Sequence, residues 1–306
     1  MSVYLDWAAT TPPDREILAE AMEVSLERYG NPSSVHEPGK RARATLEDAR
    51  IKAAAALGVK PETIFFTSGG TESNHLPILS LLQRPVRGTI AISAIEHPSI
   101  VEQARMLELT GWKTLVIPVT PDGLVTPDAV LSTIRDDTSF VAVMAVNNET
   151  GAIQPVREIA SALMNRPSGK KKPHFHVDAV QAAGKTPPGL SAQGIDSASV
   201  SAHKLQGPRG IGLLYMARKF EPFIRGGGQE AGIRPGTENL AGAVALSRCL
   251  EKNCACSLHQ GAQDTMAYLI GALNDTKLIS IIPGTRTPTD ERFSPYILQC
   301  TNERIP

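Results

Sequence analysis

FVAVMAVNNETGAIQPVREIASALMNRPSGKKKPHFHVDAV, residues 140–180, holds two apolar runs with a helical stretch between them. The runs FVAVMAV at 140–146 and FHVDAV at 175–180 have the length and composition of buried strands. A strand, a helix and a second strand in this order form a βαβ unit with parallel strands. The stretch therefore predicts an α/β fold.

The same alternation extends to both sides of this stretch. Short apolar runs alternate with helical stretches before it, and two further runs after it enclose a loop and predict a last strand pair. The remaining runs are TIFF at 63–66, TIAIS at 89–93, TLVIPV at 114–119, SASVSA at 197–202 and GIGLLYM at 210–216. We expect a mostly parallel sheet of seven strands with helices on both faces.

Helical periodicity and one further strand predict how the chain divides into domains. EILAEAMEVSLERY at 16–29 and GKRARATLEDARIKAAAALG at 39–58 predict two helices, and the segment 240–275 predicts more helix. LISIIPG at 278–284 predicts a strand that opens a second domain. We expect a large domain at 15–255 and a small α+β domain made of 1–14 and 256–306, incomplete at its C-terminal end.

Composition and charge exclude several classes of function. Lys and Arg total 31, as do Asp and Glu, so no net charge attracts a nucleic acid or an anionic membrane. MSVYLDWAATTPPD at 1–14 lacks the basic and apolar regions of a signal peptide. No apolar run approaches the ~20 residues that cross a bilayer. We therefore expect a cytoplasmic enzyme that acts on a small molecule.

The cysteines are too sparse for a disulfide scaffold. Cys249, Cys254, Cys256 and Cys300 are the four in the chain, and reduced thiols are expected. The cluster CLEKNCAC at 249–256 lacks the second pair or the nearby histidines of a metal site. We predict no metal site and interpret these cysteines as small apolar residues in a helix.

Polar residues follow several of the predicted strands, where an open α/β sheet binds its ligands. In TSGGTESN at 67–74, Gly70 and Thr71 would suit a phosphate at a helix start, although such residues also serve as ordinary caps. His97 in IEHPS can stack on a flat ring, move a proton or have a structural role. Asn147 and Asn148 in NNETG can bind a polar ligand or order a turn.

Two further segments add a carboxylate, Asp178, and an amine, Lys204, to these candidate binding residues. Asp178 follows an apolar strand with Gln181 three residues further on, and a buried carboxylate there needs a cation such as a protonated ring nitrogen or an arginine. Lys204 lies between a strand and a glycine turn, beside Ser201 and His203, where a desolvated amine can form a Schiff base. A phosphate site, a stacking imidazole, a carboxylate and an amine together match what pyridoxal phosphate requires.

Eight segments, in order, resemble those of the cysteine desulfurases of the class V aminotransferase superfamily. They are YLDWAATTP at 4–12, GNPSSVH at 30–36, FTSGGTESN at 66–74, EHPSI at 96–100, VNNETG at 146–151, HVDAVQAAGK at 176–185, SAHKLQGPRGIG at 201–212 and GGGQEAGIRPGTEN at 226–239. The resemblance covers the chain from residue 4 to its end. It implies the fold type I of pyridoxal-phosphate-dependent transferases.

The resemblance also implies a role for each residue of the site. Lys204 would carry pyridoxal phosphate, Asp178 would keep its pyridine nitrogen protonated, and Gln181 would hydrogen-bond its phenolic oxygen. His97 would stack on the ring and assist proton transfer, with Asn148 beside it. Gly70, Thr71, Ser201 and His203 would contact the phosphate. Thr237 would reach the phosphate bound by the partner subunit, which implies a homodimer.

The reaction that this resemblance implies converts L-cysteine to L-alanine. The amine of Lys204 would remove the Cα proton, and a protein cysteine thiolate would take the sulfur as a persulfide. The persulfide would then pass to an acceptor protein, a scaffold or carrier, for iron–sulfur cluster assembly or tRNA thiolation.

The sequence departs from the family pattern near its C-terminal end. The serine- and glycine-rich segment with the family's nucleophilic cysteine is absent, as is the arginine that binds the substrate carboxylate, so a C-terminally truncated chain is expected. Cys300 falls on what resembles an earlier strand and is not assigned the role. Two alternatives stay open, namely a selenocysteine lyase and a non-catalytic homologue that binds pyridoxal phosphate.

Overall fold

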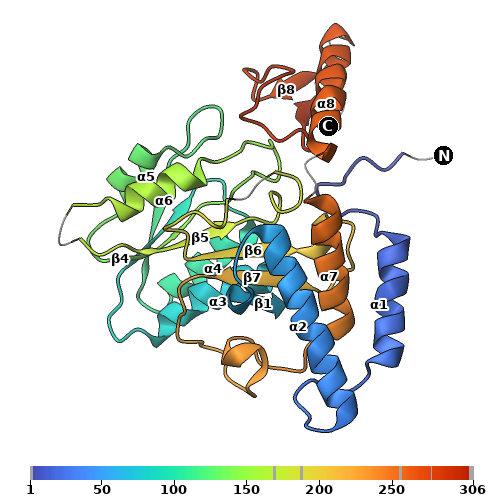
Figure 1. Cartoon of the computed structure of the whole chain (residues 1–306). Helices are drawn as coiled ribbons and strands as arrows, with labels where there is room; N and C mark the ends of the chain where they lie inside the picture. The colour runs from blue at the N-terminus through green and yellow to red at the C-terminus, as the bar shows by residue number, and fades with distance from the viewer. Residues whose placement is uncertain (1–2, 168–169, 187–188, 255–256, 277, 303–306) are drawn as a thin grey trace.

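The chain folds around a seven-stranded sheet in a computed structural model that describes residues 3–167, 170–186, 189–254, 257–276 and 278–302 (Figure 1). The strands lie in the order β1-β7-β6-β5-β4-β2-β3. Only β7 runs against its neighbours, so the sheet is mostly parallel, as predicted. The strands are β1 Ile64–Thr67, β2 Thr89–Ser93, β3 Lys113–Ile117, β4 Thr138–Ala142, β5 His174–Asp178, β6 Ser197–Ser201 and β7 Gly212–Met216.

The apolar run at 140–146 is only partly strand. β4 ends at Ala142, although Val143 to Val146 remain buried. The Ala145 N–H donates to the carbonyl of Asp178 at 2.8 Å, and Val146 forms an isolated bridge with Ile153. The apolar run therefore predicts buried residues correctly, but the regular hydrogen bonding of the strand ends before the apolar run does.

Eight α-helices and four short 3-10 helices connect the strands in the described part of the chain. The two helices expected between 15 and 58 are α1 and α2, whereas the helical segment at 240–275 is divided into α7 and α8. The α-helices are α1 Arg15–Glu27, α2 Glu37–Leu57, α3 Gly70–Leu79, α4 Pro98–Glu108, α5 Pro127–Thr133, α6 Val156–Met164, α7 Leu240–Asn253 and α8 Ser257–Thr276. The 3-10 helices are η1 Pro61–Thr63, η2 Ser80–Gln83, η3 Ala202–Lys204 and η4 Gln229–Gly232.

Alternate residues of a strand face opposite sides of the sheet, and in β1 they enter separate hydrophobic clusters. Ile64 and Phe66 of β1 belong to the largest cluster, together with residues of α2, α6 and α7. Phe65, between them, packs with Leu76 of α3. Helices thus cover both faces, which explains why every residue of β5 and β6 is buried even though polar and apolar side chains alternate along them.

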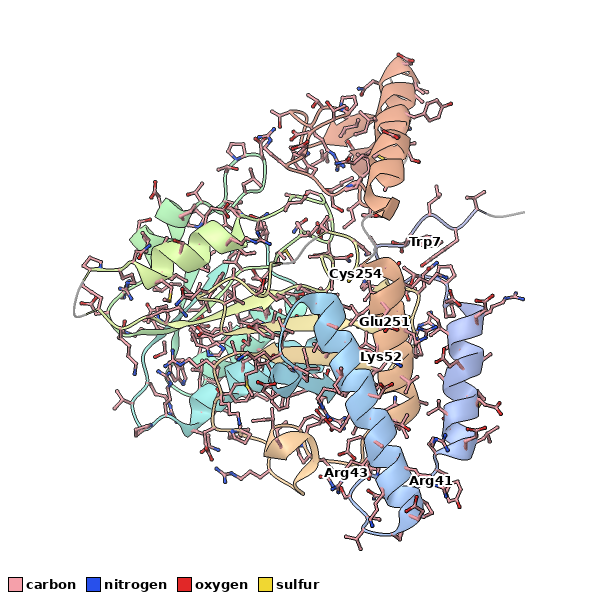
Figure 2. All side chains as sticks on the ribbon, in the orientation of Figure 1. Trp7, Arg41, Arg43, Lys52, Glu251 and Cys254 are labelled. Carbon is pink, nitrogen blue, oxygen red and sulfur yellow. The ribbon has the colours of Figure 1, made fainter. Side chains whose placement is uncertain are left out.

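Helices α2 and α7 pack along each other on one face of the sheet. Lys52 on α2 and Glu251 on α7 lie at neighbouring positions of this pair (Figure 2). Asp14 caps α1 by accepting hydrogen bonds from the N–H groups of Glu16 and Ile17, and it also binds Lys252 of α7. The N-terminal segment is thereby held against the large sheet domain.

A smaller unit follows α7. Helix α8 packs with the antiparallel pair β8 Ser280–Ile282 and β9 Gln299–Thr301 through Met266, Ile270 and Ile281. In Figure 1 this unit lies at the C-terminal end of the chain, and its β8–β9 loop contacts the hairpin after β4 through a bridge between Ala152 and Phe293. Among the described residues, no helix is long and apolar enough to span a bilayer.

Candidate active site

A cavity of about 530 Å³ opens at the carboxyl ends of the parallel strands. Its walls come from the segments that follow β1, β2, β4, β5 and β6, although these lie far apart in the sequence. The residues predicted from the sequence that line it are Gly70, Thr71, His97, Asn148, Asp178, Gln181, Ser201, His203 and Lys204. Thr237 does not line this cavity.

Lys204 ends η3, directly after β6, and its amine is held by main-chain oxygens. The Nζ donates to the carbonyls of Ala8 and Ala9, the latter at 2.7 Å. Burial lowers the pKa of the Lys204 amine, and the carboxylates of Asp6 and Asp178 oppose this effect. An amine with a lowered pKa is a better nucleophile and base near neutral pH.

Asp178 is the last residue of β5 and is 5% exposed. Its Oδ1 accepts from the Val180 N–H at 3.0 Å, and its Oδ2 accepts from the Asn74 side-chain amide at 2.8 Å. No arginine or lysine forms a salt bridge with it among the described residues. The carboxylate thus has the hydrogen bonds that orient it and can still pair with a cation in the cavity.

The start of α3 forms another part of the cavity wall, to which it contributes backbone N–H groups. Gly70 and Thr71 begin this helix, so their N–H groups and the helix dipole favour an anion. A Cβ on Gly70 would come within 2.6 Å of Val180 Cγ2. Ser201, the last residue of β6, contributes a buried hydroxyl beside it. The segment therefore has the donors and the space that a phosphate needs.

Gln181 is 4% exposed and its amide orientation is set by two contacts. Its Oε1 accepts from the Lys185 ammonium at 3.0 Å, and its Nε2 donates to the carbonyl of Ala8 at 2.9 Å. Burial, and secondly the charge of Lys204, lowers the pKa of Lys185 to about 8. Because an ammonium only donates, the NH2 group of Gln181 faces Ala8, which also lines the cavity.

His97 precedes α4 and acts as its N-cap. Its Nδ1 accepts from the Ser99 N–H at 3.1 Å and lies 2.9 Å from the Ser99 hydroxyl. The side chain of Asn147 orders the following hairpin by accepting from the N–H groups of Glu149 and Thr150. Of the two candidate asparagines, Asn147 therefore orders the turn and Asn148 lines the cavity.

His203 lies beside Lys204 and binds the N-terminal segment. Its Nδ1 is 3.2 Å from the Thr10 hydroxyl, and its carbonyl accepts from the Thr11 N–H at 2.9 Å. Burial lowers the pKa of His203 to about 4, with further contributions from the charges of Lys204, Arg209 and Lys185. The imidazole is neutral at physiological pH and can accept or donate one hydrogen bond.

Several cavity residues received no role from the sequence. Asp6, Ala8 and Ala9 line the cavity from YLDWAATTP, and Asn74 and Ser99 line it from the starts of α3 and α4. Both groups fall inside segments whose family resemblance was visible. Their roles depend on contacts with β5 and Lys204, which local sequence does not reveal.

Thr237 and the cysteines lie elsewhere. Thr237 is exposed between η4 and α7. Cys249 is buried in α7, where burial raises the pKa of its thiol to about 12, and Cys300 is exposed on β9. Cys254 caps the end of α7, and Cys256 lies outside the described residues. No described cysteine lines the cavity. No group of three or more His, Cys, Asp or Glu in the described part of the chain could hold a metal.

The residues of the cavity fit pyridoxal phosphate. The helix start with Gly70 can take its phosphate, the unpaired carboxylate of Asp178 its pyridine nitrogen, and the amine of Lys204 its aldehyde. The volume lies within the range of small-molecule sites. Sheet, cavity and residues define the class of pyridoxal-phosphate-dependent enzymes of fold type I.

The chain belongs to the class V aminotransferase family, whose model matches residues 3–293. The cysteine desulfurase IscS of Dictyoglomus turgidum is 41% identical over 254 residues, which are 81% of this chain and 63% of that relative. A NifS-like protein of known structure has a TM-score of 0.89 and 37% identity, and the match covers 100% of this chain and 83% of that one. The structure described as SspA in complex with cysteine has a TM-score of 0.86 and 28% identity, over 99% and 84% of the two chains. The chain thus spans less than two thirds of the IscS relative.

Proposed function

We propose that this chain has the activity of a cysteine desulfurase, which converts L-cysteine to L-alanine and transfers the sulfur. The observation that carries the proposal is the Lys204 amine in one cavity with Asp178 and the start of α3. The IscS relative is named a cysteine desulfurase, and the SspA structure is described as a complex with cysteine. Both names favour cysteine over other amino acids as the substrate.

Each residue of the cavity has a proposed task in this reaction. When bound, pyridoxal phosphate supplies an aldehyde for an amine and a ring that withdraws electrons from the substrate. The Asp178 carboxylate would hold a proton on the pyridine nitrogen, and the Gln181 NH2 group would bind the phenolic oxygen. Gly70, Thr71, Ser201 and His203 would hold the phosphate.

Lys204 and His97 handle the substrate protons in this proposal. The Lys204 amine, whose pKa burial lowers, removes the proton from the Cα of cysteine. His97 would stack on the ring of bound pyridoxal phosphate and assist proton transfer, and Asn148 would lie beside it. Since no described cysteine lines the cavity, a thiol outside this set takes the sulfur.

We also propose a cytoplasmic homodimer that passes sulfur to an acceptor protein, a scaffold or carrier for iron–sulfur cluster assembly or tRNA thiolation. Thr237 is exposed and lies outside the cavity of its own chain, which agrees with a dimer in which it would contact the phosphate bound by the partner subunit. A Thr237→Ala variant should therefore weaken pyridoxal phosphate binding only at concentrations at which the chain dimerises. Sedimentation and affinity measured on the same samples test this.

The activity is tested by absorbance with Lys204→Ala. The wild-type chain should acquire an absorption band near the visible edge with pyridoxal phosphate, because the amine binds the aldehyde covalently. Lys204→Ala should lose the band, whereas Lys113→Ala, on the exposed edge strand β3, should keep it. Alanine and sulfide are then assayed after addition of L-cysteine and an external thiol.

The possible outcomes separate the candidate functions. Alanine and sulfide from cysteine support the desulfurase. Alanine from selenocysteine with little turnover of cysteine would favour a selenocysteine lyase instead, and the band without any turnover would favour a non-catalytic homologue. A wild-type chain without the band would overturn the cofactor assignment itself.

A further inference from the structure

A buried asparagine links two of the cavity groups. Asn74, in α3, is 1% exposed. Its Nδ2 donates to Asp178 Oδ2 and to the Ser99 hydroxyl, both at 2.8 Å. Its Oδ1 lies 2.9 Å from Nε2 of His176. One amide thus contacts the carboxylate, the serine beside His97 and a histidine of β5.

The hydrogen bonds continue from His176 into the sheet, away from the cavity. Nδ1 of His176 is 2.7 Å from the Ser197 hydroxyl, which is 2.8 Å from Nε2 of His174. The rings of both histidines stack on Phe140, with centroids 5.9 and 5.5 Å apart. All these side chains are buried, so water does not compete for the hydrogen bonds.

The contacts determine which atom carries each proton. An ionised Asp178 only accepts, so the NH2 group of Asn74 faces it and Asn74 Oδ1 faces His176. His176 therefore carries its proton on Nε2, and its bare Nδ1 accepts from the Ser197 hydroxyl. Burial first, and the charge of His174 second, lowers the pKa of His176 to about 3, so its ring is neutral. Every donor in the series points toward the carboxylate.

The same amide acts on His97 through one intermediate. The Ser99 hydroxyl accepts from Asn74 and can therefore donate its own proton to Nδ1 of His97, 2.9 Å away. The Ser99 N–H donates to the same nitrogen. This fixes the ring nitrogen that accepts, and so the rotation of the His97 ring about its side-chain bonds.

We propose that Asn74, held by His176, is a positioning residue that sets both the Asp178 carboxylate and the His97 ring toward a bound pyridine ring. A reversed amide would turn its oxygen toward the carboxylate and, as long as the proton is on Nε2 of His176, its NH2 group toward that N–H, which are two repulsive contacts. The inference rests on the proposed function, in which Asp178 meets the pyridine nitrogen. It assigns to His176 the task of preventing that reversal.

The first experiment is nitrogen NMR of the histidine rings in the wild-type chain without cofactor. Spectra are recorded at pH values below and above the ordinary histidine pKa of about 6.5. At each pH, the rings of His174 and His176 should both be neutral and carry their proton on Nε2. A proton on Nδ1 of His176, or a charged ring at neutral pH, would overturn the series of donors. This measurement needs neither activity nor cofactor.

The second experiment compares two ligands across matched variants. The ligands are pyridoxal 5′-phosphate and 1-deazapyridoxal 5′-phosphate, in which carbon replaces the ring nitrogen. His176→Met removes the donor, and we expect it to weaken pyridoxal phosphate about tenfold, the lower range for outer hydrogen-bond partners of a binding group. The deaza compound, which makes no bond to Asp178, should be nearly unaffected. His176→Gln keeps an N–H donor and should restore most of the affinity.

Phe140→Leu provides the control for packing. It removes the ring on which both histidines stack but leaves the hydrogen-bonding groups in place, so unfolding should become easier while the ratio of the two affinities is unchanged. If that ratio instead follows the free energy of unfolding in all three variants, the role is structural and the inference fails. If His176→Met leaves the ratio of the two ligand affinities unchanged, the inference about Asn74 fails but the proposed function stands. If the wild-type chain binds neither ligand, the proposed function fails as well.

Discussion

Glu96 is a buried acid next to the cavity that does not touch it. Its Oε1 accepts from the Met144 N–H at 2.8 Å and from the Ser93 hydroxyl, whereas Oε2 is buried without a partner in the described structure. Burial raises the pKa of Glu96 to about 8, and the nearby charge of Asp178 adds to the effect. A neutral acid therefore joins the ends of β2 and β4 below the His97 segment.

This acid predicts a pH dependence of stability. The folded chain holds the proton up to about pH 8, while the unfolded chain releases it near the ordinary value of 4.5. The folded state binds more protons between these values, so Glu96 makes the free energy of unfolding fall as pH rises through that window. Glu96→Gln, neutral at every pH, should flatten this fall. Denaturant titrations of both chains at several pH values measure it, and parallel curves would contradict the assignment.

The position of Gly70 predicts that a substitution there weakens mainly the binding of the phosphate. A methyl group at this position would meet Val180 Cγ2 at 2.6 Å and displace the start of α3. Gly70→Ala should weaken pyridoxal phosphate at least about tenfold, or about 1.4 kcal/mol. Pyridoxal, which lacks the phosphate, should lose less. Gly271→Ala, where a Cβ has open space, is the control, and equal losses for both ligands would contradict a phosphate site.

At the residue scale, the sequence predicted the side chains that line the cavity better than the side chains that hydrogen-bond to them and orient them. Lys204 and Asp178 follow apolar strands, a position that chain order reveals. Asn74 depends on partners that the sheet brings close, and it contacts Asp178 and His176 across about a hundred residues. Only the order β5-β6 and the position of α3 against them define those contacts.

At the scale of elements, apolar runs located all seven strands but not their order. β1 lies at one edge because it pairs with β7, and this long-range pairing has no local signal. The run at 140–146 was longer than β4 because buried backbone past Ala142 bonds irregularly to β5 and Ile153. The apolar pattern of residues 140–146 therefore indicates which residues are buried, whereas the backbone hydrogen bonds determine where the strand ends.

A buried ion pair fastens η4 to α2 and β1. Arg50 donates twice to Glu230 at 2.8 Å, and Glu230 also accepts from the Phe66 N–H. Arg50→Met should lower the free energy of unfolding by about 3 kcal/mol, because the Glu230 carboxylate remains buried without its cation. Glu230→Gln should cost less, because Arg50 keeps its salt bridge with Glu47. The double variant should lose less than the two losses added. Denaturant unfolding of all four chains tests this, and strictly additive losses would contradict the coupling.

At the scale of the whole molecule, stability is expected to be uneven. The large sheet has helices on both faces, whereas α8, β8 and β9 share a cluster of Met266, Ile270 and Ile281. We expect the backbone amides of α8 to exchange hydrogen faster than those of β4 and β5. Mass spectrometry after exchange in deuterated water resolves the two regions. Equal protection would contradict the proposed division into a domain at 15–255 and another that includes 256–306.

The pairing of β1 with β7 has a consequence during synthesis on the ribosome. Phe65 and Phe66 leave the exit tunnel early, yet the strand that covers their edge begins only at Gly212. At about 5–20 residues per second, the nascent chain keeps that edge open for roughly 7 to 30 seconds. During this interval the unpaired edge of β1 can bind a chaperone or pair with a strand of another nascent chain.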